Sequence, residues 1–186
     1  MLFKRKKYKQ EELTDAQMIL LAQQNHKHFG LLYEKYFEQM FRFVFKRLGG
    51  DEENASDITQ QVFIKAMGAI GNYEDRGFPF STWLYRIAQN EVNMYFRKNS
   101  RNFTVEVEEK HIITLLEEME CDEKGKDHQE VLVQKLNRLK PEQLDLIELR
   151  FFQELSFREI ADIYNITEAN AKMRIYRIIE KMQQEK

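Results

Sequence analysis

The chain has 186 residues, of which 42% are apolar and 32% carry a charge, and the formal net charge is only −2 at pH 7. This composition is typical of a globular protein with one large domain or two small ones. No apolar run approaches the roughly 18 residues that a membrane-spanning helix needs, and the basic start MLFKRKKYKQ lacks the apolar stretch of a signal peptide. The single cysteine, Cys121, excludes an internal disulfide. We therefore expect a cytoplasmic protein that does not insert into a membrane.

Seven glycines and two prolines leave the chain with little turn punctuation, which favours long helices joined by short loops. The charge is unevenly distributed, with a net charge of +3 in residues 1–29, zero in 30–98, −6 in 99–130 and +1 in 131–186. We predict an all-α protein with two small helical domains, at 11–98 and 131–186, joined by a flexible acidic linker. The nearly neutral total does not exclude a nucleic-acid partner, because basic residues can still gather on one face.

The first domain is predicted to contain an amphipathic helix over residues 29–48, because apolar side chains recur there at spacings of three and four. Gly49 and Gly50 are expected to end it. The next helix, DEENASDITQQVFIKAMGAI, has an acidic first turn, which the helix dipole favours. Its inward side is apolar and consists of Ala55, Ile58, Val62 and Ala66. A separate polar side carries Asp57, Gln60 and Gln61.

Residues 80–98, FSTWLYRIAQNEVNMYFRK, form the next predicted helix and contain the only tryptophan. At about 100° per residue, an arc of about 80° collects Trp83, Arg86, Asn90, Asn93 and Arg97. The opposite side supplies a core face of Leu84, Tyr85, Ala88, Val92, Tyr95 and Phe96. The polar stripe is consistent with ordinary solvated surface. The alternative is a nucleic-acid face, on which arginine neutralises phosphate, asparagine bonds to base edges and an indole stacks on an unpaired base.

The stretch ELSFREIADIYNITEANAKMRIYRIIEKM predicts a helix-turn-helix. Ser156 and Glu159 fit a capping box, Asn165 stands where the turn needs a left-handed residue, and Thr167 can cap the second helix. That helix has a buried stripe of Ala171, Ile175, Ile178 and Met182. A polar, cationic stripe follows the same spacing and consists of Asn170, Arg174, Arg177 and Lys181. A basic second helix is typical of major-groove readers, and a plain helical hairpin with a solvated basic face is the alternative.

No cofactor or metal site is predicted. His26 and His28 form an H-x-H motif, but no nearby cysteine or acid completes a zinc site. The chain has no phosphate-binding glycine loop, and the acidic surroundings of Cys121 disfavour a reactive thiolate. An enzyme is therefore the least favoured class.

Three stretches, in this order, resemble the bacterial sigma factors of the extracytoplasmic-function group: NASDITQQVFIKA, FSTWLYRIAQNEV and ELSFREIADIYNITEANAKMRIYR. The resemblance covers about residues 29–98 and 131–183. It implies that the first domain binds core RNA polymerase and melts the promoter −10 element, and that the second domain reads the −35 element. It further implies an anti-sigma factor as a partner, and we expect a monomer when the chain is free.

The resemblance, carried over residue by residue and joined to the polar pattern of the two helices, gives three sets of expected site residues. The polar stripes and the basic end of the helix 80–98 add Asn93, Arg97, Lys98 and Lys181 to the residues that the resemblance itself implies. The −10 set lies on the helix 80–98 and on the loop before it, where a flipped base would be held, and comprises Tyr73, Phe78, Trp83, Arg86, Asn90, Asn93, Arg97 and Lys98. The −35 set lies on the second helix of the helix-turn-helix and comprises Asn170, Lys172, Arg174, Arg177 and Lys181. The polymerase-binding set comprises Asp57, Gln60 and Gln61.

The chain departs from the family pattern at several positions. Gln61 stands where an acidic residue is frequent, and Gln89 where an arginine is customary. Met94 replaces an aspartate, and Leu144 replaces an arginine. These differences leave the packing pattern intact and bear on polymerase affinity and promoter preference.

A rival from another class is a helix-turn-helix regulator that acts without polymerase, with residues 11–98 as a ligand-sensing or dimerisation domain. Such a regulator binds duplex DNA tightly by itself, typically as a dimer. A sigma factor binds DNA weakly when free and requires core polymerase. The two classes therefore differ in an observable way.

Overall fold

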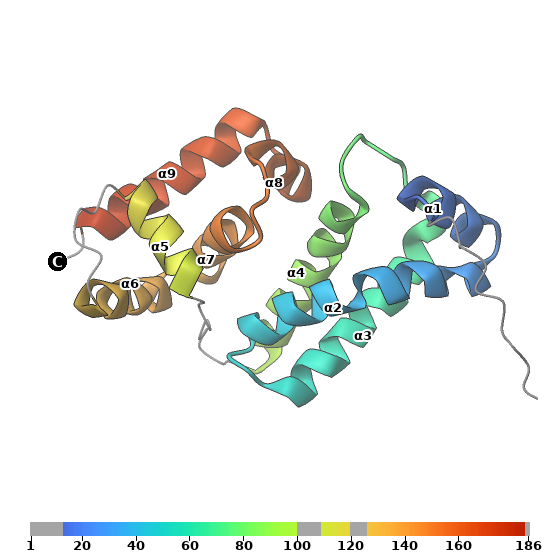
Figure 1. Cartoon of the computed structure of the whole chain (residues 1–186), viewed down its shortest axis with the longest axis horizontal. Helices are drawn as coiled ribbons and strands as arrows, with labels where there is room; N and C mark the ends of the chain where they lie inside the picture. The colour runs from blue at the N-terminus through green and yellow to red at the C-terminus, as the bar shows by residue number, and fades with distance from the viewer. Residues whose placement is uncertain (1–12, 100–108, 120–125, 185–186) are drawn as a thin grey trace, which may run out of the picture.

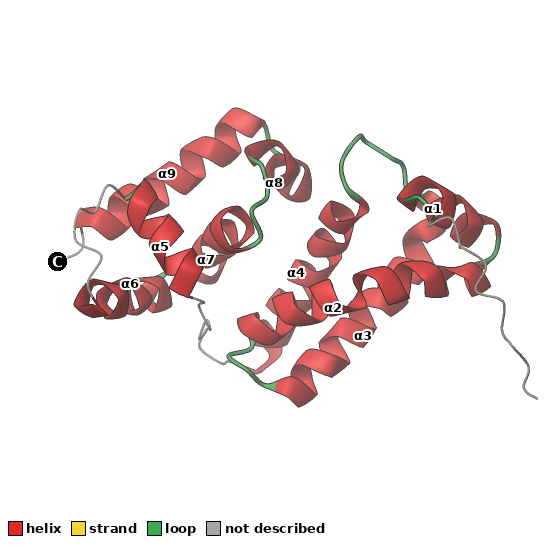
Figure 2. Ribbon diagram, in the orientation of Figure 1, coloured by secondary structure: helices red, strands yellow, loops and turns green. Residues whose placement is uncertain are grey.

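The computed structural model describes residues 13–99, 109–119 and 126–184, and these residues form helices with short connections and no strand (Figures 1 and 2). The predicted all-α fold is confirmed. Among the described helices, none is long and apolar enough to cross a bilayer. The basic segment 1–10, Cys121 and the linker residues 100–108 and 120–125 lie outside the described part of the chain.

The first domain is built on three long helices that pack on one another, with a shorter helix against the first of them (Figure 1). In chain order its elements are α1 (Asp15–Gln24), the 3-10 turn η1 (His26–His28), α2 (Phe29–Arg47), α3 (Glu52–Ala69), the 3-10 turn η2 (Ile70–Asn72) and α4 (Phe80–Asn99). Gly49 and Gly50 have φ angles of 64° and 84° and end α2 as predicted, because glycine adopts left-handed backbone without a steric penalty.

The core of the first domain uses the apolar faces that the helical spacing predicts. On α3 the buried residues include Ala55, Ile58, Val62 and Ala66, and on α4 they include Leu84, Tyr85, Ala88, Val92 and Phe96. Tyr95 is half-buried rather than fully buried, and its ring lies edge-on to Phe96 with centroids 5.6 Å apart. The predicted division of α4 into an apolar and a polar side is therefore confirmed.

The second domain packs the helix-turn-helix, α8 (Phe157–Tyr164) and α9 (Glu168–Gln184), against four preceding elements. These are α5 (Glu109–Glu118), α6 (Lys126–Arg138), α7 (Pro141–Ile147) and a single π-helical turn, η3 (Glu148–Phe152). Pro141 occupies the first position of α7, where its missing N–H costs no helical hydrogen bond.

Helix α5 differs from the expected flexible linker over residues 99–130. Its inner side carries Ile112, Leu115, Leu116 and Met119, all buried, and it packs on α6 and η3. Spacings of three and four place these residues on one side of a helix. The favourable free energy of burying them outweighs the preference of the acidic residues on the other side for a solvated chain. The second domain therefore begins by Glu109.

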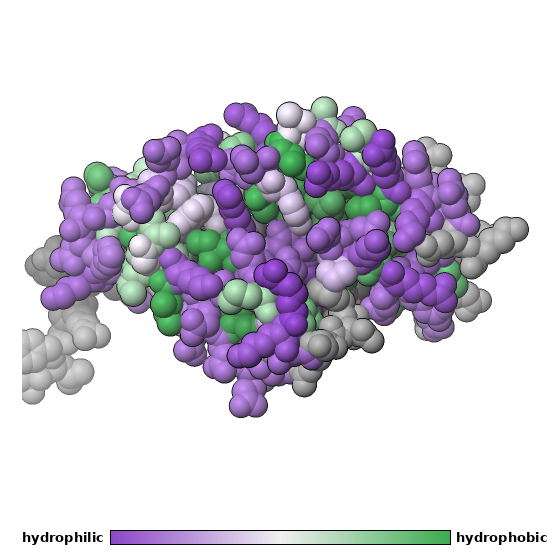
Figure 3. Space-filling view, turned by 180° about the vertical axis from the view of Figure 1, so that it is seen from behind, coloured by the Kyte–Doolittle hydropathy of each residue, from purple (hydrophilic) through white to green (hydrophobic). Residues whose placement is uncertain are grey.

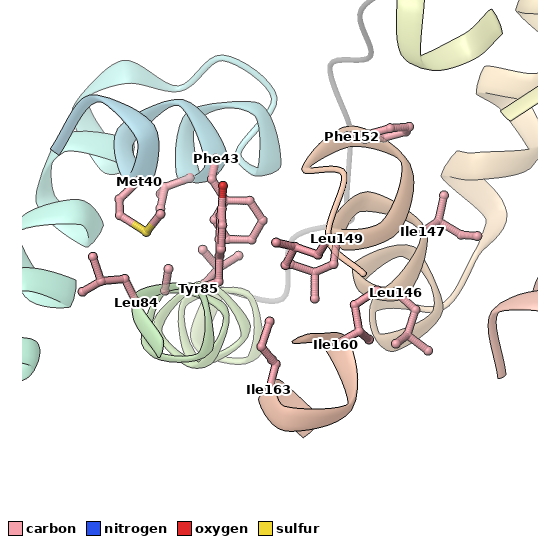
Figure 4. Close-up of a cluster of buried hydrophobic side chains, with 14 of the residues drawn as sticks. Met40, Phe43, Leu84, Tyr85, Leu146, Ile147, Leu149, Phe152, Ile160 and Ile163 are labelled. Atoms are coloured by element: carbon pink, nitrogen blue, oxygen red, sulfur yellow. The ribbon is translucent and has the colours of Figure 1, made fainter. Parts of the chain in front are cut away.

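The two domains lie against each other, with α4 next to α8 (Figure 1). One continuous cluster of buried apolar side chains runs through both domains. Figure 4 shows this cluster from α2 and α4 on one side to α7, η3 and α8 on the other, including Tyr85, Leu149, Ile160 and Ile163. On the outer face seen in Figure 3, hydrophilic residues dominate, and hydrophobic residues show in patches between them.

Leu115→Ala is expected to lower the free energy of unfolding by about 2–5 kcal/mol, because it leaves a cavity under α5. The matched control is Val131→Ala on α6, where the side chain is 47% exposed and a change within about 0.5 kcal/mol is expected. Urea unfolding followed by circular dichroism measures both. An unchanged midpoint for Leu115→Ala would show that α5 is not part of the second domain's core.

Candidate nucleic-acid interface

The polar stripe of α4 is accessible along most of its length. Arg86, Asn90, Arg97 and Lys98 are exposed, and Asn93 is half-buried. The stripe forms because the opposite side of the same helix is held in the core, which fixes the rotation of α4 about its axis. Two guanidinium groups, one ammonium group and the amides therefore lie on one side of the first domain.

Trp83 belongs to an aromatic cluster at the start of α4. Its ring centroid lies 5.1 Å from that of Tyr73 and 5.3 Å from that of Phe80, and the Tyr73 and Phe80 centroids are 5.2 Å apart. Phe80 is buried and anchors the cluster, whereas Trp83 is half-buried. Sequence analysis placed Trp83 wholly on the polar stripe, but the structure divides the indole between the cluster and the surface.

A hollow of about 100 Å³ opens beside this cluster. Its lining includes Tyr73, Phe78, Trp83 and Arg86, so the structure brings together four members of the predicted −10 set. The loop that carries Phe78 turns at Gly77, whose φ is 76°. Burial raises the pKa of Tyr73, and nearby carboxylates including Asp75 raise it further, so its phenol remains a neutral hydrogen-bonding group.

The helix-turn-helix shows the three local features that the sequence predicts. Ser156 Oγ accepts a hydrogen bond from the Glu159 N–H at 3.2 Å, and Glu159 Oε2 accepts one from the Ser156 N–H at 2.8 Å. Asn165 adopts the left-handed conformation, with φ 52° and ψ 49°. Thr167 Oγ1 accepts from the Asn170 N–H at 3.2 Å. These contacts satisfy free N–H groups at both helix starts, and the left-handed Asn165 ends α8.

The recognition helix α9 carries its predicted cations on two sides. Arg174, Arg177 and Lys181 are exposed on one side, where Arg174 Nε donates to Asn170 Oδ1 at 2.9 Å. Lys172 lies on the other side, and its Nζ is 6.0 Å and 5.8 Å from the ring centroids of Phe157 and Tyr176. The structure therefore does not bring Lys172 together with the other members of the −35 set.

Met173 lies between those two sides at the middle of the outer face of α9. Its side chain is 45% exposed, and sequence analysis did not single it out. The exposure of Met173 could have been predicted from the sequence, because this residue lies between Lys172 and Arg174 and outside the buried stripe that repeats every three or four residues.

The predicted polymerase-binding set is exposed on α3. Asp57, Gln60 and Gln61 all point away from the core. Sequence analysis missed their apolar neighbours Ile64 and Met67, which are 54% and 37% exposed. Ile64 follows Gln60 and Gln61 by four and three positions, so the three side chains lie on adjacent turns.

Three charged side chains meet in the interface between the domains and are termed here the ion cluster: Arg47 at the end of α2, Asp145 of α7 and Glu148 of η3. They are only 1%, 2% and 2% exposed. Arg47 Nη2 donates to Asp145 Oδ1, and Arg47 Nε lies 3.0 Å from Glu148 Oε2. None of the three was singled out from the sequence, because their proximity depends on how the domains pack.

The ion cluster contains one cation and two acids, and its burial is the main influence on the pKa of both carboxyls. Burial raises the pKa of Glu148 to about 7, although Arg47 lowers it, and the negative charge of Asp145 raises it further. Burial also raises the pKa of Asp145, against the opposing effects of Arg47 and Asn93. When Glu148 is protonated, the three side chains together carry no net charge. This state has the lowest desolvation free energy in a low-dielectric interior.

Polar side chains of α4 also bond directly to the second domain. Asn93 Nδ2 donates to Asp145 Oδ2 at 3.2 Å, and Gln89 Nε2 donates to the Tyr164 hydroxyl at 2.7 Å. Gln89 stands where the resembling family has an arginine, and in this chain it is buried in the domain interface. One predicted DNA contact, Asn93, is thus already bonded within the protein.

A groove of about 650 Å³ lies between the two predicted DNA-binding sets. Its lining includes Arg86, Asn90 and Asn93 of α4 and Arg174 and Arg177 of α9. Within the described residues, no group of three or more histidine, cysteine, aspartate or glutamate side chains is placed to hold a metal ion. Glu142 and Asp145 also line this groove, so it combines cationic and amide groups with two acids.

Two family models match the chain, and they do so in the order of the two domains. The model described as Sigma-70 region 2 matches residues 32–102, and the model described as Sigma-70, region 4 matches residues 129–182. The first includes α2, α3 and α4, and the second includes the helix-turn-helix. Together with the all-α architecture, these matches define the class as a sigma-70 type factor.

Curated relatives refine this class. The chain is 31% identical over 160 residues to the ECF RNA polymerase sigma factor BldN of Streptomyces coelicolor, covering 81% of this chain but only 57% of that protein. It is 32% identical to the RNA polymerase sigma factor YlaC of Bacillus subtilis, with 71% and 76% covered. It is 30% identical to the ECF RNA polymerase sigma factor SigW of the same organism, with 80% and 83% covered.

Solved structures share the fold at lower sequence identity. The chain matches CnrH, solved in complex with the cytosolic domain of CnrY, with a TM-score of 0.56 and 20% identity, covering 89% and 92% of the two chains. It matches the sigma factor RpoE of Bartonella quintana, solved in complex with the anti-sigma factor NepR, with a TM-score of 0.57 and 21% identity, covering 85% and 96%. The chain belongs to the extracytoplasmic-function group of the sigma-70 family, whose members are transcription initiation factors that direct RNA polymerase to promoters.

Asn165→Val is expected to destabilise the second domain by about 1–2 kcal/mol, because a β-branched residue is strained in left-handed backbone. Asn165→Gly at the same position is the matched control and should stay within about 0.5 kcal/mol of the parent. Urea unfolding monitored by circular dichroism measures both. Equal stability of the two variants would contradict the left-handed geometry of the turn.

Proposed function

We propose that α4 and the loop before it bind the opened −10 element. The observation that carries this proposal is the combination, at one helix, of the aromatic hollow beside Trp83 with the cationic and amide stripe. Unstacking a base step costs a few kcal/mol, and stacking one base on an aromatic side chain returns about 1–3 kcal/mol. Arg86 and Arg97 would neutralise phosphates while the hollow between Tyr73 and Phe78 holds a flipped base.

The second domain would read the −35 element through α9. Arg174 and Arg177 are suited to bidentate hydrogen bonds with guanine or to phosphate contacts, and Asn170 and Lys181 extend the same side of the helix. Met173 at the centre of the exposed face can make an apolar contact with a thymine methyl group. Lys172, on the opposite side, would contact the neighbouring phosphate backbone if it takes part in binding.

Core RNA polymerase would dock on α3. The exposed side of this helix pairs the polar residues Asp57, Gln60 and Gln61 with the apolar residues Ile64 and Met67. An apolar centre with a polar rim is the usual make-up of a protein–protein interface. Gln61 in place of an acid lowers the charge of this surface, so the contact would rely more on Ile64 and less on salt bridges.

The remaining features of the activity follow from this role. The chain would act as a non-catalytic factor of the polymerase, in the cytoplasm, as a monomer when free and without a cofactor. Two observations support an anti-sigma factor as a regulatory partner. One is the family, and the other is that the similar RpoE of Bartonella quintana was solved with such a factor.

Run-off transcription with purified core polymerase on genomic DNA fragments tests this function. Promoter-specific transcripts that depend on the added chain are expected, together with weak duplex binding by the chain alone. The rival regulator is not favoured, because the matched region 2 occupies the part of the chain that it would use for sensing or dimerisation. Tight dimeric duplex binding without transcripts would overturn the proposal.

Trp83→Ala is expected to reduce promoter opening by about 5- to 150-fold, which corresponds to the loss of about 1–3 kcal/mol of base stacking. Its effect on folding should be smaller than that of Phe80→Ala, because Phe80 is buried and Trp83 is not. Leu20→Ala, at a position that is 55% exposed on α1 of the same domain, is the control for both. Permanganate reactivity of −10 thymines measures opening, and urea unfolding measures stability. If Trp83→Ala chiefly unfolds the domain, the indole is structural.

A further inference from the structure

Helix α1 contacts the segment that forms one wall of the aromatic hollow. It precedes residue 32, where the match to Sigma-70 region 2 begins, and none of the expected site residues lies on it. It packs on α2 and on the turn η2, which leads into the loop before α4 (Figure 1). The contacts of α1 therefore reach the hollow where this loop starts, at Tyr73.

One side chain of α1, Gln23, makes the polar contact with this segment. Its Nε2 donates to the backbone carbonyl of Ile70 at 3.1 Å and to the backbone carbonyl of Tyr73 at 2.9 Å. The Ile70 carbonyl also accepts the Tyr73 N–H at 3.1 Å, which closes the turn η2. A side-chain amide has two N–H donors, so both donors of Gln23 are used at this turn. The amide thus fixes the place where α3 ends and the loop begins.

The position of Tyr73 controls the shape of the hollow. Its ring lies edge-on to the rings of Phe80 and Trp83, at interplanar angles of 76° and 66°, and it lines the hollow. Aromatic pairs depend on such geometry for part of their interaction free energy. A displacement of the Tyr73 backbone would therefore be passed to Trp83, on which an unpaired base would stack.

A second set of contacts fixes α1 itself. At its first turn, Asp15 accepts hydrogen bonds from Lys35 Nζ at 2.7 Å and from the Tyr36 hydroxyl at 2.5 Å. The Tyr36 ring centroid in turn lies 5.5 Å from that of Phe80. Gln23 lies in the last turn of the same helix, about 12 Å further along its axis. Both ends of α1 are thus tied to segments that support the hollow.

The far end of the loop is contacted by the second domain instead. Arg76 Nη1 lies 3.3 Å from Asp162 Oδ1, and the guanidinium of Arg158 lies 5.1 Å from the ring centroid of Phe78. Asp162 also lines the hollow, so α8 covers part of it. Different elements therefore hold the two ends of the loop, and the contact made by Gln23 lies wholly within the first domain.

We propose that Gln23 is a positioning residue for the unpaired −10 base, and that it keeps the hollow in a shape that admits the base by holding the carbonyls of Ile70 and Tyr73. Among the described residues, those that line the hollow do not include Gln23, so it acts through Tyr73 and Trp83. The effect on DNA rests on the proposed function, whereas the effect on the shape of the hollow does not. An apolar side chain of similar length cannot replace Gln23, because both carbonyls would lose a donor.

Fluorescence of Trp83 tests the effect on the hollow in the full chain, because Trp83 is the only tryptophan of the sequence. The test variant is Gln23→Met, which keeps the length of the side chain and removes both donors. The matched control is Gln24→Met, the same change at the next position, where the side chain is exposed. Quenching by acrylamide measures how accessible the indole is, and circular dichroism verifies that each chain is folded.

Quenching of Trp83 is expected to be stronger in Gln23→Met than in the parent, because Tyr73 is no longer held beside the indole. It should be unchanged in Gln24→Met. A second variant, Gln23→Asn, keeps the amide but is one methylene shorter, so it should show the same increase. This variant also decides the matter if Gln23→Met does not fold. Parental quenching in the folded Gln23 variants would overturn the proposal.

Binding of DNA distinguishes a positioning role from a general loss of stability. The probe is a single-stranded oligonucleotide with the non-template −10 sequence of a promoter found by run-off transcription, and it is bound by the chain in complex with core polymerase. Each −10 base is replaced in turn by an abasic site. The base held in the hollow is the one whose removal matters less in Phe78→Ala than in the parent. In the parent, its removal should weaken binding about 5- to 150-fold, the range for one stacked base.

In Gln23→Met this loss should be about two- to tenfold smaller, the range for one lost hydrogen bond, while the probe without the base binds parent and variant equally. If the variant instead weakens the binding of both probes alike, or if the loss is undiminished, the positioning role is wrong. A parent that is insensitive to the removal of every −10 base would contradict the proposed function. The quenching of Trp83 would then still decide whether Gln23 shapes the hollow.

Discussion

A guanidinium buried between two helical domains has to be neutralised where it lies, and the placement of the domains depends on this requirement. Arg47 obtains its counter-charges from Asp145, which follows it by 98 positions, and from Glu148. Breaking a buried ion pair by removing one partner typically costs about 3–5 kcal/mol, whereas an intact pair adds little net stability over hydrated charges. The cluster is consistent with the observed docking geometry, while the apolar contacts around Tyr85 and Ile163 supply the favourable burial.

Helix α4 contacts the second domain on a surface that adjoins the proposed −10 site. Its apolar side is committed to the core, part of which, at Tyr85, also contacts the second domain, so the exposed part of its polar side is what remains for the proposed contact with DNA. Gln89 illustrates the consequence, because a neutral amide can be buried against Tyr164 at the position where the family customarily has an arginine. A guanidinium there would have to be neutralised within the buried interface, so the departure from the family pattern fits the packing of α8 on α4.

Much of the site could be predicted because its signals are local. The period of the apolar residues fixed the rotation of α4 and α9, and the caps at Ser156 and Thr167 and the turn at Asn165 depend only on residues a few positions apart. The predictions that failed concerned residues whose local pattern was masked or ambiguous. The apolar side of α5 was hidden within dense acid, and Lys172 was assigned by resemblance although helical geometry puts it opposite Arg174. Ile64 was missed because a single exposed apolar residue is common on protein surfaces.

The amino-acid sequence by itself determined the all-α class, the two helical domains, the helix-turn-helix and the side of α4 that carries Trp83, Arg86 and Asn90. Each of these follows from spacings within one or two helical turns. Only the tertiary structure decided that Arg47 meets Asp145 and Glu148, and that α8 covers the aromatic hollow. Contacts between residues about a hundred positions apart depend on how finished helices pack, and no periodicity in the chain encodes that packing.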